Sequence, residues 1–456
     1  MVEAAFYGDD FTGSTDALLQ FARCGLLGVL LVDLPPIDEL HALATRYDVI
    51  GVAGIARSLP PDEQEAELRP VLTALRYLNP RVVQYKICST ADSSPELGSI
   101  GRALEVGRSV FGPATVPILA AQPDLGRYTV FSHHFAAESG TVHRLDRQPP
   151  MAYHPATPMR ESDLRRHLAG QTDLRIAGLH LTDYADISGN LARSTADAVV
   201  LDALTDNDLE RLGQAIVASG NGMPSFAIGS GGLSRAVALS LSSTARAADR
   251  AALRSARAAP RSPDDAGSGP APTSADRAQA LVVSGSQSPR TRQQLGHALA
   301  SGWLILTVPD PTAGQQAVAA LLNGTPGVVV HTGRHTEQPA PHLVGTFGEV
   351  LAGVVRKVVH NTAVRRVAIA GGDTSGRIVR ALGVATLEVL PADHQLSPGT
   401  VLCRATSSDA LLDELHLLLK PGQLGAPDLF ETFRTLCAPS ATVPDPGGGE
   451  TQALDR

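Results

Sequence analysis

Short apolar runs alternate with segments of helical periodicity along most of this 456-residue chain. Examples of the runs are residues 25–34 (GLLGVLLVDL), 81–87 (RVVQYKI) and 366–370 (RVAIA). Residues 63–78 have helical spacing, and two prolines stand where that helix would begin. Apolar runs separated by helices are typical of parallel strands that are covered on both faces. The pattern therefore predicts an α/β fold in which mainly parallel sheets are flanked by helices.

One stretch interrupts this alternation and divides the chain. Residues 256–278 (ARAAPRSPDDAGSGPAPTSADRA) are rich in Pro, Ala, Ser, Gly and Asp and show no apolar period. Such a composition is typical of a flexible linker. We therefore predict two α/β domains, over residues 1–255 and 279–437, and a disordered tail over residues 438–456.

Composition and charge argue against several kinds of partner. The formal net charge is −8, and no basic stripe with interleaved aromatic residues is present, so a nucleic-acid partner is not expected. No apolar run reaches the roughly 18 residues that a membrane helix needs, and no signal peptide precedes the first strand. The four cysteines are scattered, which is typical of a reducing compartment. We expect a cytoplasmic protein.

The first polar corner carries two adjacent carboxylates. An apolar run over residues 2–7 ends in the sequence GDDFTGSTD (residues 8–16), after which a helical pattern begins. In an open α/β sheet, ligands bind beyond the carboxyl ends of the strands, and two free carboxylates there are costly to desolvate without a partner. A capped helix start explains one of them but not the pair. We therefore predict that Asp9 or Asp10 contacts a ligand.

A second polar corner in the same half is the sequence KICSTADSS (residues 86–94). It offers one cation, one carboxylate and four hydroxyls, a set that suits a polyhydroxy acid. The alternative is a serine-rich loop that caps a helix. The His- and Arg-rich stretch over residues 122–160 is a candidate for recognising an anion, although a solvated loop fits it equally well. Asp202 and the glycine corner at residues 229–232 stay open in the same way.

Two corners in the C-terminal half join a strand to a helix through small residues, namely SGSQS (284–288) and GGDTSG (371–376). Small residues let the backbone approach a phosphate, and a helix N-terminus favours negative charge. Asp373 could hold Mg²⁺, which prefers carboxylates together with phosphate oxygens. Each corner alone could be a capped turn, and neither is a P-loop or a GxGxxG fingerprint. A hydroxyl-rich half and a phosphate-binding half together indicate a kinase.

In their order and spacing these motifs resemble those of the four-carbon acid sugar kinase family, the ATP-dependent kinases of tetronates and 3-oxo-tetronates. The resemblance extends from Gly8 to Gly425 and also includes HPATPMRESDL (154–164), VLDALTD (200–206), GSGGL (229–233), SPG (397–399) and KPGQLG (420–425). It implies a sugar-binding N-terminal domain, a nucleotide-binding C-terminal domain, and ATP with Mg²⁺ as cofactors. Residues 93–101 and 144–159 look more like the branch that includes 3-oxo-isoapionate kinase.

Carried over by position, the resemblance implies two sets of contacts. ATP would contact Ser286, Gly371, Gly372, Asp373, Thr374 and Gly422, with Asp373 as the metal ligand. The substrate would contact Asp9, Asp10, Lys86, Ser89, Thr90 and Asp92. The chain departs from the family at Gly8, which is usually Ala, at Ala91, where many members have Phe, and at Gln287, which is commonly Cys. These departures bear on the substrate and not on the reaction.

We therefore predict an ATP-dependent kinase of a small sugar acid, either 3-oxo-isoapionate or a four-carbon tetronate or 3-oxo-tetronate. Asp9 or Asp10 would orient the acceptor hydroxyl and take its proton. The candidate partners are the small-molecule acid and a second copy of the chain in a homodimer. The alternatives are a non-catalytic sugar-acid-binding protein with the same fold, and a dehydrogenase, which the absence of a GxGxxG fingerprint disfavours.

Overall fold

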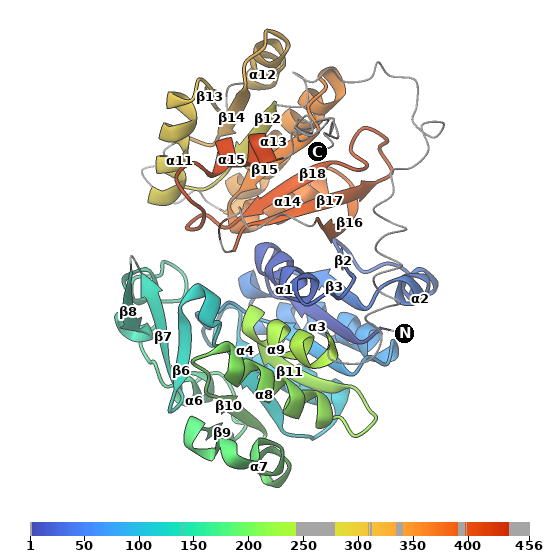
Figure 1. The fold of residues 1–456 in the computed structure, drawn as a ribbon, viewed down its shortest axis with the longest axis vertical. Coiled ribbons are helices and arrows are strands. Elements are labelled where there is room, and N and C mark those ends of the chain that lie inside the picture. Colours follow the sequence, from blue (N-terminus) through green and yellow to red (C-terminus); the bar gives the residue numbers. More distant parts are fainter. Residues whose placement is uncertain are drawn as a thin grey trace, which may run out of the picture.

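The computed structural model describes residues 2–242 and 279–436, apart from residues 139, 309, 311, 334–340, 391–396 and 398. The predicted linker over residues 256–278 and the predicted tail over residues 438–456 lie outside the described residues. Figure 1 shows the two halves of the chain, one above the other, with their sheets in contact.

The N-terminal half forms a parallel sheet in the order β2-β3-β1-β4-β11-β5-β10-β9. Most of these strands are the apolar runs that the sequence predicts as buried. The strands are β1 (Ala4–Gly8), β2 (Gly28–Leu31), β3 (Val49–Ala53), β4 (Val82–Lys86), β5 (Val116–Leu119), β9 (Ile176–Leu179), β10 (Ala198–Leu201) and β11 (Ser225–Gly229). The helices are α1 (Phe11–Arg23), α2 (Ile37–Arg46), α3 (Pro61–Tyr77), α4 (Ile100–Phe111), α6 (Leu164–Ala169), α7 (Ile187–Arg193), α8 (Asp206–Ala218) and α9 (Gly231–Ser242).

A small antiparallel sheet stands beside this half (Figure 1). Its strands are β6 (Arg127–Val130), β7 (His133–Glu138) and β8 (Thr141–Arg144), and α5 (Pro149–Ala152) follows them. The sequence indicates a long excursion without periodic features here, and regular strands were not predicted. The strands of the small sheet lack the apolar runs seen in the large sheet, because the small sheet has only a minor core of its own. This core consists of Ala136, Leu145, Met151 and Met159.

The C-terminal half continues as β13-β14-β12-β15-β18-β17-β16, with β16 and β17 antiparallel to their neighbours. The strands are β12 (Ala280–Ser284), β13 (Leu304–Thr307), β14 (Gly327–His331), β15 (Arg366–Ala370), β16 (Val384–Val389), β17 (Val401–Ser407) and β18 (His416–Lys420). The helices are α11 (Pro289–Ala300), α12 (Ala313–Leu322), α13 (Pro341–Asn361), α14 (Gly372–Ala381) and α15 (Leu429–Leu436).

The two halves share one sheet of 15 strands, because β16 pairs antiparallel with β2. The backbone N–H of Val32 extends this pairing by donating to the Ala385 carbonyl at 3.0 Å. One hydrophobic core follows a single face of the whole sheet and includes Leu18 of α1 and Ile378 of α14. The opposite face carries a separate core in each half. The predicted α/β class with mainly parallel strands is confirmed, whereas the shared sheet was not predicted.

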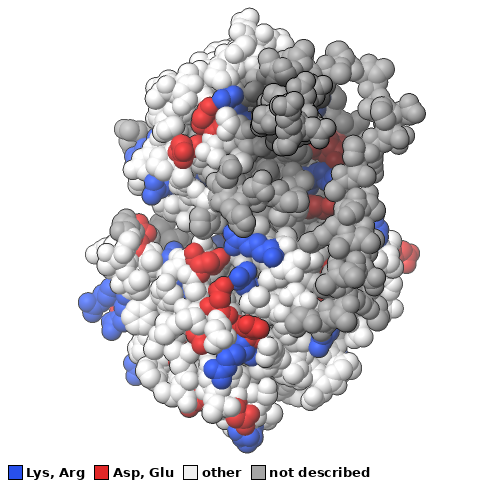
Figure 2. Space-filling view, viewed as in Figure 1, with Lys and Arg blue, Asp and Glu red and all other residues white. Residues whose placement is uncertain are grey.

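The surface drawn in Figure 2 carries charges of both signs. On the face drawn in Figure 2, Lys and Arg side chains are interspersed with Asp and Glu, and no extended area carries a single sign. Within the described ranges, no helix is both long enough and apolar enough to span a membrane.

Candidate functional site

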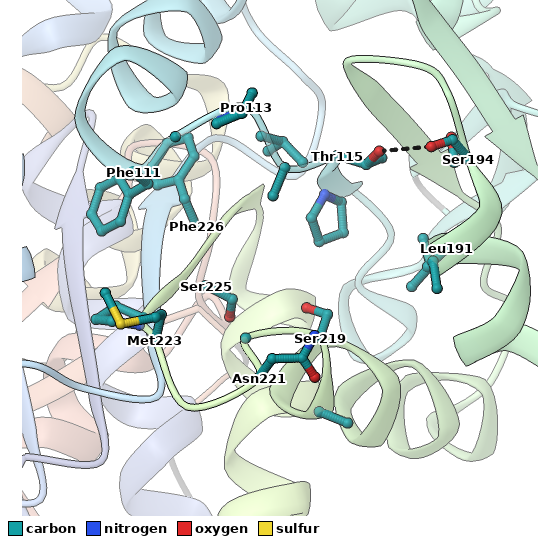
Figure 3. Close-up of a pocket in the computed structure, with 18 of the residues that line it drawn as sticks. Phe111, Pro113, Thr115, Leu191, Ser194, Ser219, Asn221, Met223, Ser225 and Phe226 are labelled. Carbon is teal, nitrogen blue, oxygen red and sulfur yellow. Dashed lines mark hydrogen bonds between the residues drawn. The ribbon is translucent and has the colours of Figure 1, made fainter.

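A large cavity of about 610 Å³ lies at the amino ends of β5 and β11 (Figure 3). Phe111, Met223 and Phe226 line it, together with small polar side chains. The one charged residue of its lining, Arg108, is paired with Asp197 at 2.9 Å. The cavity is therefore at the opposite edge of the sheet from the polar corners, which follow the carboxyl ends of the strands.

The two polar corners of the N-terminal half are neighbours in space. Strands β1 and β4 are paired in parallel, with Gly8 opposite Lys86, and the backbone N–H of Asp9 donates to the Lys86 carbonyl at 2.9 Å. Asp9, Asp10 and Lys86 are all buried, with 2%, 9% and 2% of their surface exposed. The structure thus brings three of the predicted substrate residues together.

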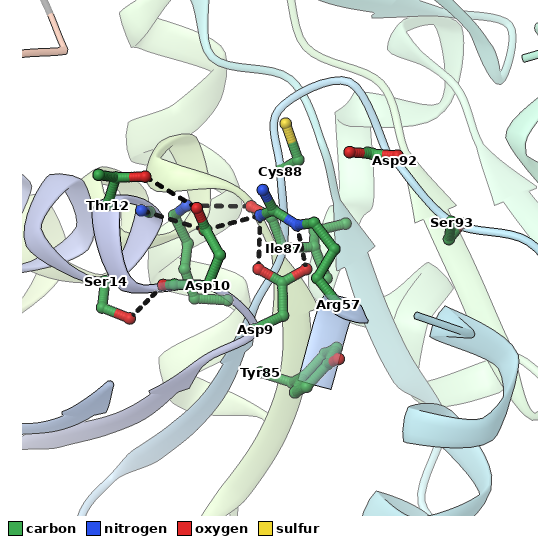
Figure 4. Close-up of polar contacts among 12 residues, drawn as sticks. Asp9, Asp10, Thr12, Ser14, Arg57, Tyr85, Ile87, Cys88, Asp92 and Ser93 are labelled. Carbon is green, nitrogen blue, oxygen red and sulfur yellow. Dashed lines mark hydrogen bonds and ion pairs between the residues drawn. The ribbon is translucent and has the colours of Figure 1, made fainter. Parts of the chain in front are cut away.

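Arg57, which sequence reasoning missed, holds both carboxylates (Figure 4). It lies in a 3-10 turn (Ala56–Ser58) directly after β3. Its Nε and Nη2 donate to the two oxygens of Asp9 at 3.1 and 2.6 Å, and Nη2 also donates to Oδ1 of Asp10 at 2.8 Å. The signal for this residue was a lone cation just past the end of a strand predicted to lie in the same sheet. The pair of carboxylates thus has the cationic partner that its burial requires.

The environment gives the two carboxyl groups different proton affinities. Burial raises the pKa of Asp9 to about 6, although Arg57 opposes the shift. Burial acts in the same direction on Asp10, but Arg57, Lys86 and the hydrogen bonds from Thr12 and Gly13 outweigh it, so the pKa of Asp10 lies below its usual value. Asp10 is therefore held ionised, and Asp9 takes up a proton at a higher pH than Asp10 does.

Asp10 also begins α1. Its Oδ1 accepts from the backbone N–H of Gly13 at 3.0 Å, and its Oδ2 accepts from the Thr12 hydroxyl at 2.8 Å. The helix-cap interpretation is thus correct for this residue, and it does not exclude a contact with substrate. A Cβ at Gly13 would lie 2.2 Å from Asp10 Oδ1 and 2.9 Å from Lys86 Nζ, so a glycine is required where these charges meet.

The remaining predicted substrate residues form a second group. The Thr90 hydroxyl is buried and lies 3.0 Å from Cys88 Sγ. The Ser89 carbonyl accepts from Nε2 of His134 at 2.7 Å, and Nδ1 of this ring lies 2.9 Å from the Thr129 hydroxyl. The carbonyl fixes the tautomer, because it can only accept a hydrogen bond. The small sheet is thereby attached to the loop of residues 86–94, which carries predicted substrate residues and is called the substrate loop below.

Asp92 contacts the segment that follows the small sheet. Its Oδ1 accepts from the Thr157 hydroxyl and lies 3.8 Å from Nδ1 of His154. Nδ1 of His154 in turn accepts from the backbone N–H of Thr157 at 3.1 Å. The motif that contains these residues was noted in the sequence, but its contact with Asp92 spans 65 residues and has no local signal.

The two small-residue corners of the C-terminal half line one cavity of about 500 Å³. It collects every predicted ATP residue whose side chain the structure describes, and it is lined by Gly285, Ser286, Gln287, Ser288, Pro289, Gly371, Gly372, Thr374, Gly422 and Gln423. The first turns of α11 and α14 both open into it. A Cβ at Gly285 would lie 2.3 Å from Thr374 Oγ1, and one at Gly422 would lie 2.7 Å from Ser286 Oγ. Glycine backbone on the wall of the cavity thus lies directly against the hydroxyls of Ser286 and Thr374, which leaves no room for a larger residue.

Asp373 lies in the first turn of α14, between Gly372 and Thr374, which line the cavity. Its side chain is outside the described part of the structure. Across the residues that are described, no group of three or more His, Cys, Asp and Glu side chains could hold a metal ion. The sequence supplies one carboxylate in this turn, and Mg²⁺ can be held by a single protein carboxylate when phosphate oxygens and water are its other ligands.

The corner that carries Asp9 and Asp10 and the corner GGDTSG (371–376) meet where α1 and α14 begin. A Cβ at Gly372 would lie 3.7 Å from the Thr12 hydroxyl, and one at Gly376 would lie 3.0 Å from Cβ of Phe11. Three successive antiparallel pairings, β2/β16, β16/β17 and β17/β18, separate the two parallel sets. The two sites therefore lie on either side of the contact between the first turns of α1 and α14, which is called the seam below.

Comparisons with known proteins agree with this division. A family model described as a sugar-binding N-terminal domain matches residues 4–237, and one described as a nucleotide-binding C-terminal domain matches residues 281–430. The 3-oxo-isoapionate kinase of Paraburkholderia graminis is 35% identical over 94% of this chain and 93% of its own length. A 3-oxo-tetronate kinase of Cupriavidus necator is 30% identical over 93% of this chain and 94% of its own length.

Solved structures share the fold. A Salmonella typhimurium LT2 protein described as a tRNA synthase superposes with a TM-score of 0.71 and 23% identity, and the match covers 94% of this chain and 98% of that one. A Haemophilus influenzae protein superposes with a TM-score of 0.65 and 20% identity over 94% of this chain and 99% of that one. At these identities the likeness concerns the fold alone.

Proposed function

Because the chain belongs to the four-carbon acid sugar kinase family, we propose that this sugar-acid kinase phosphorylates 3-oxo-isoapionate. The relative that bears this activity in its name is the more similar of the two curated relatives described above. A four-carbon 3-oxo-tetronate or tetronate is the second candidate, since the second relative is a 3-oxo-tetronate kinase. The acid binds within residues 1–255, and ATP binds within residues 279–437.

The observation that carries the proposal is the seam between α1 and α14. Phosphoryl transfer needs little covalent chemistry from the protein, but the acceptor oxygen and the γ-phosphate must lie in line. The 3.7 Å between the Cβ position of Gly372 and the Thr12 hydroxyl supports such an alignment, because each residue belongs to one of the two corners. No second layer of protein separates the corners there.

In this mechanism Asp10 orients the acceptor hydroxyl and accepts its proton. Asp10 is the more exposed carboxylate of the pair, and Thr12, its hydrogen-bond donor, lies on the nucleotide side. Asp9 supports Asp10 through Arg57, which occupies both Asp9 oxygens. Lys86 offers its ammonium to the carboxylate of the acid, while Ser89, Thr90 and Asp92 contact its hydroxyl groups.

The phosphates of ATP bind to the first turns of α11 and α14. Backbone N–H groups and the hydroxyls of Ser286 and Thr374 donate to the phosphate oxygens, and Gly371, Gly372 and Gly422 allow their close approach. Asp373 would hold Mg²⁺, which would supply positive charge to offset the negative charge of the phosphates.

Initial rates of ADP formation on the two acids test the proposal. The wild-type enzyme with ATP and Mg²⁺ is expected to show saturable ADP formation with 3-oxo-isoapionate and a lower kcat/KM with 3-oxo-tetronate. The reverse preference would assign the second candidate. Absence of ADP formation with both acids would contradict a kinase of these substrates and favour a sugar-acid-binding protein.

We also propose a homodimer that acts in the cytoplasm. The terminal strands β13 and β9 each have a single strand partner within the described ranges, and open edges of this kind pair readily with another chain. The described cysteines Cys24, Cys88 and Cys403 are free thiols, which fits a reducing compartment. Light scattering of the purified protein tests the assembly, and a monomeric mass would contradict it.

A further inference from the structure

Lys420 lies beneath the cavity of about 500 Å³ that Ser286 and Gly422 line, called the phosphate cavity below. The inference about this lysine rests on the proposed binding of ATP in that cavity. It is the last residue of β18 and is fully buried. Its Nζ donates to Thr291 Oγ1, to the Pro421 carbonyl and to the Gly422 carbonyl, each at 3.0 Å. All three donors of the ammonium are therefore used, and all three acceptors are neutral groups.

We propose that Lys420 is a positioning residue for ATP, which aims the Ser286 hydroxyl at a phosphate oxygen and fixes the Gly422 backbone beside it. Lys420 does not line the cavity, whereas Ser286 and Gly422 do. Its action passes through Thr291, which lies in the first turn of α11.

The direction of each hydrogen bond follows from the lysine. Because an ammonium only donates, Thr291 Oγ1 accepts from Lys420 and must give its own hydrogen elsewhere. The Gly422 carbonyl already accepts from Lys420 and from the Ser288 hydroxyl. Thr291 Oγ1 lies 3.0 Å from both the Gly422 carbonyl and Ser286 Oγ. Because two other donors already occupy the carbonyl, we assign the Thr291 hydrogen to Ser286 Oγ.

Ser286 is then left as a donor. Its Oγ accepts from Thr291 and also from the backbone N–H of Ser288 at 3.3 Å, so its two lone pairs are used. Its own O–H has no acceptor among the described residues. A hydroxyl in this state on the wall of a cavity donates to whatever acceptor enters, and phosphate oxygens are strong acceptors.

The positive charge of Lys420 also favours binding of a phosphate in the cavity. No carboxylate of the described residues lies within salt-bridge distance of its Nζ, and Arg290 is the charged neighbour that affects it. Burial, with a further contribution from Arg290, lowers the pKa of Lys420 to about 7. A phosphate in the cavity would provide the anion that this lysine lacks and would favour its ammonium form, in which it only donates.

The chain offers a matched control in Lys86. Both lysines end a parallel strand, both are buried, and each donates to the carbonyl of the next residue. They lie in different halves, under different corners. In either case a Lys-to-Met substitution keeps an unbranched side chain that reaches the position of Cε, and it removes the ammonium.

The experiment measures the KM for ATP and for the sugar acid, and the Kd for ATP by titration calorimetry, in Lys420→Met and Lys86→Met. Loss of a charged hydrogen-bond network predicts that Lys420→Met weakens ATP binding by about tenfold or more, with the KM for the acid within about twofold. Lys86→Met should instead raise the KM for the acid and leave the affinity for ATP within about twofold. Unchanged ATP affinity in Lys420→Met, or an equal rise in both KM values, would overturn the proposal.

Thr291→Val provides a second route, since it keeps the lysine and removes the hydroxyl that connects it to Ser286. It is expected to raise the Kd for ATP as well, and it decides the question if Lys420→Met does not fold. Calorimetry with ATP alone separates this inference from the proposed substrate. If wild-type protein binds ATP but phosphorylates neither acid, the substrate assignment fails while the role of Lys420 is still measured.

Discussion

At the scale of single residues, Arg57 makes the two neighbouring carboxylates unequal. Asp9 gives both of its oxygens to the guanidinium, whereas Asp10 shares one oxygen with Arg57 and Gly13 and receives Thr12 on the other. An ionised carboxylate that still faces the seam is suited to take a proton from an acceptor hydroxyl. The roles of the two aspartates therefore differ in a measurable way.

We expect Asp10→Asn to lower kcat by roughly 10²-fold or more, the size of effect typical of losing a general base. The KM for ATP should change by less than about twofold, because the side-chain partners of Asp10 within the described ranges, Thr12, Gly13 and Arg57, do not line the phosphate cavity. Steady-state rates of ADP production measure both quantities. Wild-type turnover in this variant would show that Asp10 does not act on the acceptor.

Gly422→Ala is expected to raise the KM for ATP by about tenfold, because its Cβ would lie 2.7 Å from the Ser286 hydroxyl and displace it. Gly296→Ala is the matched control in α11, where a Cβ meets nothing within 4 Å. That control should leave the KM for ATP unchanged and stabilise the protein by roughly 0.5–1 kcal/mol. Equal KM values in both variants would argue against close backbone packing at the nucleotide site.

The predictable part of the site is the part that is local in sequence. Asp9, Asp10 and Lys86 stand directly at strand ends, and strand ends are where α/β sheets bind ligands. Arg57 also follows a strand, but its role depends on β3 lying next to β1, and a lateral order of strands has no signature within one segment. Thr157 meets Asp92 across an even longer separation, so only the fold reveals that contact.

At the scale of elements, the small sheet is attached to the substrate loop by one buried histidine. His134 of β7 is fully buried, and burial lowers its pKa to about 4. This sheet was not predicted because its strands are polar: all four residues of β8 are exposed or half-buried. The apolar strands of the large sheet were predicted because they are covered on both faces.

Acid is expected to destabilise the protein through this histidine. Below about pH 6.5 the unfolded chain takes up a proton at His134 that the folded chain resists, so stability falls as the pH drops toward 4. The loss from this group amounts to about 2 kcal/mol at pH 5. Urea unfolding at pH 7 and pH 5 measures it. In His134→Gln, which retains a donor for Ser89, the decrease between the two pH values should be smaller by that amount, and an unchanged decrease would contradict the assignment.

At the scale of the whole molecule, the shared sheet and the continuous core join the two halves. Strand β2 pairs with β16, and Arg380 of α14 donates to the Ala53 carbonyl at 2.8 Å and to the Val32 carbonyl at 3.3 Å. The sequence indicates two domains, and nothing in either strand marks it as the partner of the other. Pairing between distant edge strands is set by the global arrangement and not by local propensity.

We therefore expect the two halves to unfold together. The single tryptophan, Trp303, lies in the C-terminal half, and all seven tyrosines lie in the N-terminal half. Tryptophan fluorescence and tyrosine derivative absorbance thus report one half each, and their thermal transitions should coincide. Arg380→Ala, which removes the contacts with β2 and β3, should lower both midpoints or separate them. Separate transitions in the wild-type protein would show that the halves are independent.

The attachment of the small sheet has an evolutionary consequence. The small sheet contacts the Ser89 carbonyl through His134, and the segment that follows the sheet contacts Asp92 through Thr157, whereas main-chain pairing in the large sheet joins the two halves. On the proposed roles of Ser89 and Asp92, choice of acid and transfer of phosphate would be encoded in separable parts of the chain. We therefore expect mutational drift within residues 127–157 to change the preferred acid while the machinery proposed to handle ATP is inherited intact.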